Sequence, residues 1–580
     1  MYPRGRVFGP RWDSFSSTIP SLLRDIPIIL AALALFYGLI SLTGYWASPV
    51  NVQPVIQLSP FALPKYALFS VVRLAAAYAI SLFFTLAYAY FASHNARAER
   101  ILIPLLDTLQ SIPVLSFLPP VMVAVVALFP ARQLGVELGC ILLIFTGQVW
   151  NMTFSVYTSM KNVPREMLEA AQVYRLSWWQ SFIQLELPYA AIGLVWNSMM
   201  SVAGGWFFLM ACEMFVLGNR DLRLPGLGSY LQTAANAGDT RAIVWGVFTM
   251  IAVIVLMDQL IWRPTIAWSE KFKFEQIEAS DVPRSPILNL LRRSKALAYA
   301  GRISVAPLRE ILSLRFARRQ NSPARIHTSR RWSKWPTRVL AFLILLGVGL
   351  LVVRMSLLVL RVSASELRSI LWAAGATFLR VEFVIMIAGL WTIPAGVYIG
   401  MHPKLAAIAQ PMVQIAASVP ATALFPIVLM ALIRLGGGLG IGSILLLLMG
   451  TQWYILFNVI AGASAIPTDL KEVCAVFRLS PVERWRRLYL PGIFPYLITG
   501  FVTALGGAWN ASIVAEYVRF QGRTITTTGL GAVISRATDA GDFPTLLVST
   551  IVMACIVVSL NRLLWRPLYG LASARFNLNS

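Results

Sequence analysis

The sequence predicts an all-α polytopic membrane protein whose twelve transmembrane helices form two parallel six-helix repeats. Three observations lead to this fold class: an apolar composition, twelve apolar segments long enough to cross a bilayer, and an internal repeat. Of the 580 residues, 57% are hydrophobic and 13% are charged, whereas soluble domains average about 45–50% and about 25%. This apolar surplus excludes a soluble enzyme and argues against a secreted disulfide scaffold, a disordered chain or a nucleic-acid module.

The formal net charge of +24 fits a membrane protein, because Lys and Arg collect in cytoplasmic loops and orient the helices. No nucleic-acid partner is therefore expected; membrane lipid is. The cysteines and histidines are scattered along the chain without the spacing of a metal site or a disulfide framework: Cys140, Cys212, Cys474, Cys555, His94, His327 and His402. We expect neither a metal nor a cofactor.

A helix needs about 20 apolar residues to span the hydrocarbon core. Twelve segments qualify, in two sets of six. They are 26–47, 66–92, 104–130, 138–160, 187–217 and 242–264 in the first set, and 338–360, 376–401, 405–433, 438–463, 488–515 and 543–566 in the second. The third and ninth segments share a cluster of prolines, which predicts either broken helices that line a cavity or plain packing kinks: Pro113, Pro119, Pro120, Pro411, Pro420 and Pro426.

The loop charges predict that both termini lie in the cytoplasm, because basic residues flank the first, second and fourth spans on one side. Four regions result: an N-terminal cytoplasmic segment (1–25), a first repeat (26–268), a basic cytoplasmic linker (269–337) and a second repeat (338–580). The linker is dense in Arg and too polar to span. Part of it, 287–316, is either an amphipathic helix on anionic lipid or a solvated tether.

The internal repeat is the strongest regularity in the sequence. At an offset of 303 residues, Trp150 aligns with Trp453, Glu169 with Glu472, Trp206 with Trp509, and Glu213 with Glu516. Upstream of the external loop that follows the third span the offset becomes 307, where Arg73 aligns with Arg380. Because six spans are an even number, both repeats enter the membrane in the same direction. The chain is thus predicted to be a fused pseudo-dimer with a path between its halves.

Two predicted cytoplasmic loops share one pattern. In residues 163–177 and 466–480 a proline, Pro164 or Pro467, opens a short amphipathic helix whose first turn is acidic. A Leu-Pro pair that ends at Pro188 or Pro491 follows each range. Acidic residues favour the positive end of the helix dipole. The pattern is typical of a loop that another protein grips; the alternative is a pair of ordinary connectors preserved by duplication.

These loops resemble the EAA signature of binding-protein-dependent ABC import permeases. Glu169, Ala170 and Ala171 match the signature literally, whereas the second copy matches only at Glu472. Arg175 and Arg478 stand where the family has glycine, which suggests either an altered turn or a charge-assisted contact. Glycine-rich segments before Glu213 and Glu516 resemble the fifth-helix region of the nitrate, sulfonate, taurine and bicarbonate branch.

The resemblance implies a type I ABC importer permease fold in the bacterial inner membrane. It implies that each loop is a coupling helix seated on a cytoplasmic ABC ATPase dimer, and that an extracytoplasmic binding protein delivers the solute. The residues expected to couple to the ATPase are Glu169, Ala170, Ala171, Arg175, Pro188, Glu472, Arg478 and Pro491. The branch suggests nitrate, sulfonate, taurine or bicarbonate as the solute.

Ionisable groups inside spans are costly, so each is a candidate for function. Glu213 and Glu516 end equivalent spans, where they either shape an outer gate or pair locally with a basic residue such as Arg220 or Arg519. Two facing carboxylates would repel an anion. The candidate path or gate residues are Trp206, Glu213, Trp509, Asn510 and Glu516. Arg73 and Arg380 are expected to snorkel to water.

No Gly-x-x-x-x-Gly-Lys-Ser/Thr loop occurs in the sequence, so we expect no catalytic residue of its own and an energy source on a separate ATPase. Two rivals remain open. A secondary transporter of the major facilitator type also has six plus six spans, but its Asp-Arg-containing loop after the second span is missing here. A membrane scaffold without transport would bind no ATPase.

Overall fold

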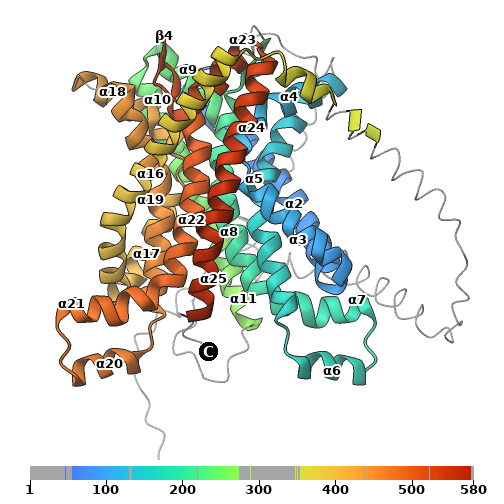
Figure 1. Ribbon diagram of the computed structural model, residues 1–580, viewed down its shortest axis with the longest axis vertical. Helices are drawn as coiled ribbons and strands as arrows, with labels where there is room; N and C mark the ends of the chain where they lie inside the picture. Colours follow the sequence, from blue (N-terminus) through green and yellow to red (C-terminus); the bar gives the residue numbers. More distant parts are fainter. Residues whose placement is uncertain are drawn as a thin grey trace, which may run out of the picture. The chain divides into compact units, whose positions relative to one another are not determined.

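The computed structural model describes residues 55–129, 133–217, 220–272, 353–436, 438–520 and 523–575, with six single residues, Trp46, Leu288, Leu346, Gly347, Gly349 and Leu350. The predicted span 26–47, most of the predicted span 338–360 and nearly all of the linker lie outside these ranges. The described part is helical apart from two short hairpins, β1–β2 and β3–β4 (Figure 1). The all-α membrane class is therefore correct.

The elements of the first repeat, in chain order, are η1 (Pro60–Ala62), α2 (Leu63–His94), α3 (Ala96–Ser111), η2 (Val114–Phe117), α4 (Leu118–Leu128), α5 (Leu134–Lys161), α6 (Arg165–Val173), α7 (Trp178–Ser181), η3 (Phe182–Glu186), α8 (Leu187–Glu213), β1 (Val216–Leu217), β2 (Arg220–Asp221), α9 (Leu227–Ala237), α10 (Thr240–Met257), η4 (Asp258–Trp262), α11 (Arg263–Ser269) and η5 (Glu270–Phe272).

The elements of the second repeat are α16 (Ala364–Gly400), α17 (Pro403–Ser418), α18 (Ala421–Arg434), α19 (Leu439–Ser464), α20 (Thr468–Val476), α21 (Pro481–Arg484), η7 (Trp485–Tyr489), α22 (Leu490–Ala515), β3 (Tyr517–Phe520), β4 (Arg523–Thr526), α23 (Leu530–Ala540), α24 (Phe543–Leu560), η8 (Asn561–Trp565) and α25 (Arg566–Arg575).

Ten of the twelve predicted spans fall on described helices. Eight helices are long and apolar enough to cross a membrane, and two bent helix pairs raise the count to ten among the described residues. The bent pairs are Ala96–Gln110 with Val114–Leu128, at 86°, and Met412–Ser418 with Ala421–Arg434, at 83°. Pro113 and Pro420 stand at the two breaks as N-caps of the following helices. The proline clusters thus mark broken helices, because proline cannot continue the preceding hydrogen-bond ladder.

The repeat extends to details of the backbone. The short helices α6 and α20 begin and end at positions 303 residues apart, as do the π-helical segments η3 and η7 and the pair η4 and η8. Gly238 and Gly541 end the equivalent helices α9 and α23 with φ angles of 69° and 68°. Duplication has therefore preserved local conformation as well as sequence.

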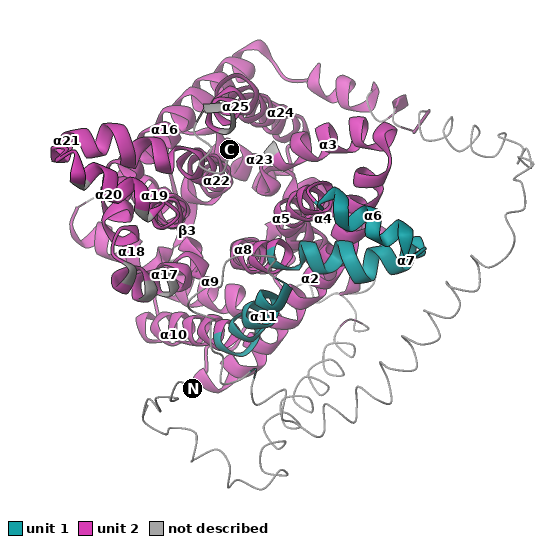
Figure 2. Cartoon of the chain, turned by 90° about the horizontal axis from the view of Figure 1, so that it is seen from below, with its two compact units in different colours: residues 1–44, 163–192, 259–328 teal, residues 45–162, 193–258, 329–580 magenta. Residues whose placement is uncertain are grey.

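The chain divides into two compact units (Figure 2). Residues 163–192 belong to unit 1; both bent pairs, the two hairpins and most of the spans belong to unit 2. Within unit 2 the repeats exchange contacts, since α10 packs on α17 and α18 whereas α24 packs on α3 and η2. Figure 1 shows α20 and α21 at one end of this unit and α23 and β4 at the other.

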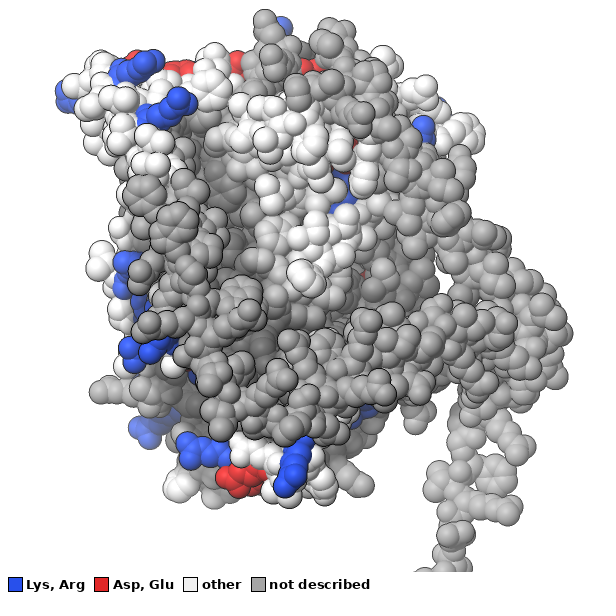
Figure 3. Space-filling view, turned by 90° about the vertical axis from the view of Figure 1, so that its right-hand side faces the viewer, with Lys and Arg blue, Asp and Glu red and all other residues white. Residues whose placement is uncertain are grey.

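The surface of the described part is largely apolar, as a lipid-facing surface requires. Large hydrophobic side chains are exposed along the long helices, including Phe83 at 77% and Trp372 at 77%. On the face in Figure 3 most described atoms belong to uncharged residues, and Lys and Arg occur in small groups. The structure is thus consistent with a multi-pass membrane protein.

Candidate functional site

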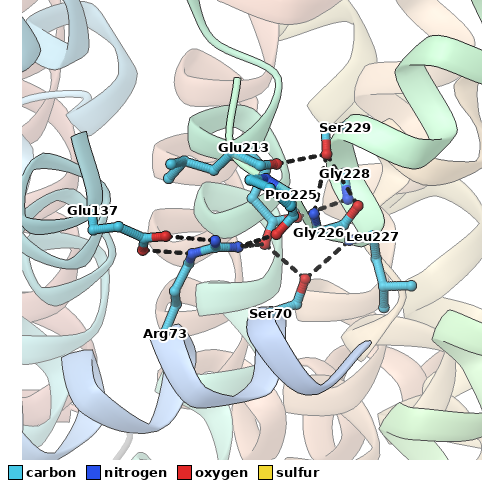
Figure 4. A network of polar contacts seen from close by, with 10 residues as sticks. Ser70, Arg73, Glu137, Glu213, Pro225, Gly226, Leu227, Gly228 and Ser229 are labelled. Atoms are coloured by element: carbon cyan, nitrogen blue, oxygen red, sulfur yellow. Dashed lines mark hydrogen bonds and ion pairs between the residues drawn. The ribbon is translucent and has the colours of Figure 1, made fainter. Parts of the chain in front are cut away.

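A fully buried ion network joins three helices of the first repeat (Figure 4). The Arg73 guanidinium on α2 donates to both carboxylate oxygens of Glu137 on α5, at 2.6 and 2.7 Å, and to Glu213 Oε1 at the end of α8, at 2.8 Å. All three side chains are fully buried. Two carboxylates therefore share one guanidinium, whose fork geometry permits the bidentate contact with Glu137.

The Glu213 carboxylate also caps the helix that follows the hairpin. The Gly228 N–H donates to Glu213 Oε2 at 2.7 Å, and the Ser70 hydroxyl donates to Glu213 Oε1 at 2.7 Å. Negative charge is favourable at a helix N-terminus. A Cβ at Gly226 would overlap the Glu213 carboxyl group, so this close approach requires glycine.

The second repeat builds the same arrangement with one carboxylate fewer. Arg380 on α16 pairs with Glu516, the Gly531 N–H donates to Glu516 Oε2 at 2.8 Å, and the Thr377 hydroxyl donates to Glu516 Oε1 at 2.8 Å. The position equivalent to Glu137 is Gly440. The Arg380 side chain is 12% exposed, against 0% for Arg73.

These networks correct two sequence-based expectations. Arg73 does not snorkel to water, and Arg380 is only slightly exposed. Glu213 and Glu516 do pair with a basic residue, but the partners are Arg73 on α2 and Arg380 on α16 and not the neighbours Arg220 and Arg519. Arg519 pairs instead with Asp539 at 2.5 Å. The sequence did carry a signal for the pairing, because a repeated Arg in one span accompanies a repeated Glu in another.

A central cavity of about 260 Å³ lies within unit 2 between residues of both repeats. Its wall includes the broken-helix segments at Val114 and Pro420, so these breaks do line a cavity. Several wall positions are repeat equivalents: Gly147 and Gly450, Asn151 and Tyr454, Met200 and Thr503, Gly204 and Gly507, and Phe207 and Asn510. Equivalent positions of the two repeats thus contribute to one wall, as expected for a cavity on the pseudo-symmetry axis.

Of the five candidate path residues, only Asn510 lines this cavity. Its side-chain oxygen accepts the Leu115 N–H at 3.1 Å, a contact from the second repeat to η2 of the first. Trp206 is 1% exposed, and Trp509, Glu213 and Glu516 are 0% exposed. None of these four lines either described cavity. The structure therefore gives them packing and pairing positions.

A second cavity, which we call the hairpin-end cavity, has a volume of about 390 Å³. It lies where α8 and α22 end and the hairpins begin. Its two arginines are each paired, Arg223 with Asp221 at 2.5 Å and Arg519 with Asp539 at 2.5 Å. Partial burial lowers the pKa of the Arg519 guanidinium, whereas its bond to the Asp539 carboxylate raises it. The net effect is a raised pKa. The arginine charges in this wall are thus balanced by aspartates.

The two predicted coupling loops each form a pair of short helices, α6–α7 in unit 1 and α20–α21 in unit 2. Within each pair, Ser177 or Ser480 caps the second helix with a reciprocal capping box. Ala171 and Cys474 face inward, 9% and 8% exposed. Glu169, Ala170 and Glu472 are exposed, whereas Pro188 and Pro491 are half-buried at the start of α8 and α22.

Each loop also exposes a matching apolar pair. Val173 and Tyr174 at the end of α6 are 79% and 78% exposed, and the equivalent Val476 and Phe477 are 79% and 73% exposed. Large apolar side chains grouped on a loop beside carboxylates are typical of a protein-binding surface.

Arg175 and Arg478 adopt left-handed backbone conformations, with φ angles of 50° and 48°. They are the only non-glycine residues with positive φ in the described part of the chain. The turn after each short helix thus has the conformation that glycine favours, although arginine occupies it. The turn is therefore left-handed even though arginine replaces the glycine of the EAA pattern.

Replacing both arginines with glycine, Arg175→Gly with Arg478→Gly, is expected to preserve the loops and relieve about 1 kcal/mol of backbone strain at each turn. Arg175→Ile with Arg478→Ile, which the left-handed region disfavours strongly, is expected to disrupt them. Limited proteolysis of the two variants would compare loop integrity. Faster cleavage of the glycine variant than of the isoleucine variant would contradict the assignment.

Together, a polytopic helical fold, a duplicated helical unit and a central cavity lined by both repeats are typical of a membrane transport component. The family model for the binding-protein-dependent transport system inner membrane component matches residues 81–261 and 392–564. The chain therefore belongs to this family, the permease components of ABC transporters, and carries two copies of its domain.

Relatives with assigned names agree with the family. The chain is 27% identical over 208 residues to a nitrate import permease protein of Leptolyngbya laminosa, covering 36% of this chain and 69% of the relative. It is 32% identical over 151 residues to a bicarbonate transport system permease protein of Synechocystis, covering 26% and 52%. It is 25% identical over 187 residues to a taurine transport system permease protein of Escherichia coli, covering 32% and 61%.

Proposed function

We propose that this permease moves a small solute inward by alternating access, driven by a separate ATPase dimer that grips both EAA-like loops. The observation that carries the proposal is the duplicated loop surface, in which exposed Glu169 and Glu472 stand beside equivalent exposed apolar pairs. One chain with two such surfaces fits an ATPase dimer, because two equivalent sites suit a partner with twofold symmetry.

In this mechanism ATP binding draws the two loops together and rocks the repeats from an inward-facing to an outward-facing state. An extracytoplasmic binding protein then delivers solute to the central cavity, and hydrolysis resets the permease. Nucleotide can shift this equilibrium only by its differential affinity for the two states. The chain itself acts as a transport subunit and not as an enzyme, since its sequence has no P-loop.

We propose further that both termini are cytoplasmic. We also propose that the chain consists of an N-terminal segment (1–25), a first repeat (26–268), a linker (269–337) and a second repeat (338–580). Within unit 2, α20 and α21 lie at the end opposite to α23 and β4 (Figure 1). This placement supports a cytoplasmic loop at one end and an extracytoplasmic hairpin at the other. The candidate solutes are nitrate, sulfonates, taurine and bicarbonate, from the branch resemblance and the names of the relatives.

The proposal is tested by purifying the full chain together with an ATPase and a binding protein encoded beside it. We expect the chain to retain the ATPase through purification, and the binding protein to stimulate ATP hydrolysis in membranes or nanodiscs. A folded, inserted chain that retains no ATPase would contradict the proposal. Uptake that collapses with a protonophore while ATP is maintained would instead favour the major facilitator alternative.

A further inference from the structure

We infer that Asn510 is the latch of an outer gate. Its hydrogen bond to the Leu115 backbone holds shut the passage between the hairpin-end cavity and the central cavity, and this bond has to break before solute can pass. The inference rests on the proposed function, because it takes the two cavities as successive parts of the solute's path. It is carried by the cavity walls, by the polar contacts between them and by a difference between the repeats.

Two segments contribute to both cavities at neighbouring positions. Val114 lines the central cavity, and the next residue, Leu115, lines the hairpin-end cavity. On α22, Asn510 lines the central cavity, and Ile513, about one turn further on, lines the hairpin-end cavity. Val114 and Leu115 are buried. These positions therefore form a wall between the two cavities, which we call the septum.

The septum contains a backbone N–H that its own helix cannot satisfy. Pro113 is the N-cap of η2, so Leu115 is the second residue of a new helix, and the first N–H groups of a helix have no partner within it. Asn510 Oδ1 accepts the Leu115 N–H at 3.1 Å. The amide is oriented for this bond, because Asn510 Nδ2 donates to the Gly506 carbonyl of α22 at 2.9 Å. A side chain of the second repeat thus completes a helix start of the first.

A second side chain of the second repeat contacts the same segment. The Thr550 hydroxyl on α24 is shared between the Ser116 carbonyl, at 3.1 Å, and the Leu546 carbonyl of its own helix, at 2.8 Å. A buried N–H that loses its acceptor costs more than an ordinary hydrogen bond contributes. The Asn510 bond therefore stabilises the closed septum most, and Thr550 adds less because its hydroxyl keeps Leu546 as an acceptor.

The counterpart positions in the other repeat cannot make these bonds. Phe207 is the repeat equivalent of Asn510, and Val247 is the equivalent of Thr550. Neither side chain has a polar atom, so neither can pair with the backbone at the second break, beside Pro420. The structure therefore assigns the latch to the break of the first repeat and not to the equivalent positions at the second. The two sides of the proposed gate are unequal.

The test measures access across the septum in spheroplasts that express the full chain without its binding protein. A sulfonate-bearing methanethiosulfonate, which does not cross membranes, is added outside, and mass spectrometry of the purified chain quantifies the labelled cysteine. Thr503→Cys places a reporter in the wall of the central cavity, and Ser535→Cys places one in the wall of the hairpin-end cavity.

We expect the reagent to label Ser535→Cys clearly faster than Thr503→Cys in the otherwise wild-type chain. Asn510→Leu, of similar size but without an acceptor, should raise the labelling rate of Thr503→Cys about tenfold, because it leaves the Leu115 N–H unpaired in the closed state. The rate at Ser535→Cys should stay the same. Thr550→Val, which is isosteric, should raise the rate of Thr503→Cys about twofold.

Asn197→Leu is the matched control. Asn197 makes the same bond to the carbonyl four residues back on α8, at 3.0 Å, and lines neither described cavity. Equal rates at Thr503→Cys with Asn510→Leu and with Asn197→Leu would overturn the inference. So would a Thr503→Cys reporter that is labelled as fast as Ser535→Cys in the otherwise wild-type chain. If Asn510→Leu does not insert, an unchanged rate with Thr550→Val would overturn it.

Failure of the proposed function is distinguishable from failure of the latch. A Ser535→Cys reporter that is labelled only in inverted vesicles would contradict the proposed orientation, and the same variants would then test the latch from that side. A chain that retains no ATPase is recognised by co-purification, whereas labelling across the septum does not require the ATPase.

Discussion

Replacing Arg73 with glutamine is expected to lower the free energy of unfolding by about 3–5 kcal/mol, the usual cost of removing one partner from a buried ion pair. The substitution leaves Glu137 and Glu213 fully buried without their shared positive charge. It also removes the link between α2, α5 and α8. The measurement is the thermal unfolding midpoint and the monodisperse yield of the detergent-solubilised chain.

The repeat offers a matched control in Arg380→Gln. Arg380 pairs with one carboxylate, is 12% exposed, and lacks the counterpart of Glu137, so we expect a clearly smaller loss. Adding Glu137→Gln to Arg73→Gln should recover part of the stability, because one of the two buried charges is then gone. Equal losses for Arg73→Gln and Arg380→Gln would contradict the role assigned to the double carboxylate.

Reversing the charge of both loop glutamates, Glu169→Arg with Glu472→Arg, is expected to abolish retention of the ATPase and ATP-driven uptake. Both side chains are exposed on the short helices that we assign to the ATPase contact. A like-charge mismatch at an interface costs several kcal/mol, and two mismatches act on one complex. Co-purification and uptake measure the effect, with membrane insertion checked by size-exclusion chromatography.

The neutral variant, Glu169→Gln with Glu472→Gln, is the control for charge reversal. It removes the carboxylates without adding repulsion, so we expect weakened but measurable ATPase binding. Each single reversal should fall between the wild type and the double variant, because one loop remains intact. Full retention of the ATPase by the double reversal, in a well-folded chain, would remove the loops from the proposed contact.

The sequence alone determined the class, the ten spans that fall on described helices and the repeat, because each depends on local or periodic features. Apolar segments of bilayer length appear without knowledge of their neighbours. The proline clusters located both broken helices, and the offset of 303 residues carried through to equivalent helix ends. The EAA-like residues likewise form a contiguous pattern, and the family match agrees with them.

Only the tertiary structure decided which residues from distant parts of the chain lie next to each other. Arg73 and Glu213 are 140 residues apart in the chain, so their individual contexts suggested a snorkelling arginine and a carboxylate that either shapes a gate or pairs with a neighbour such as Arg220. Their contact depends on how α2 and α8 pack, which no local pattern encodes. The central cavity has the same origin, because its described wall draws on residues from both repeats.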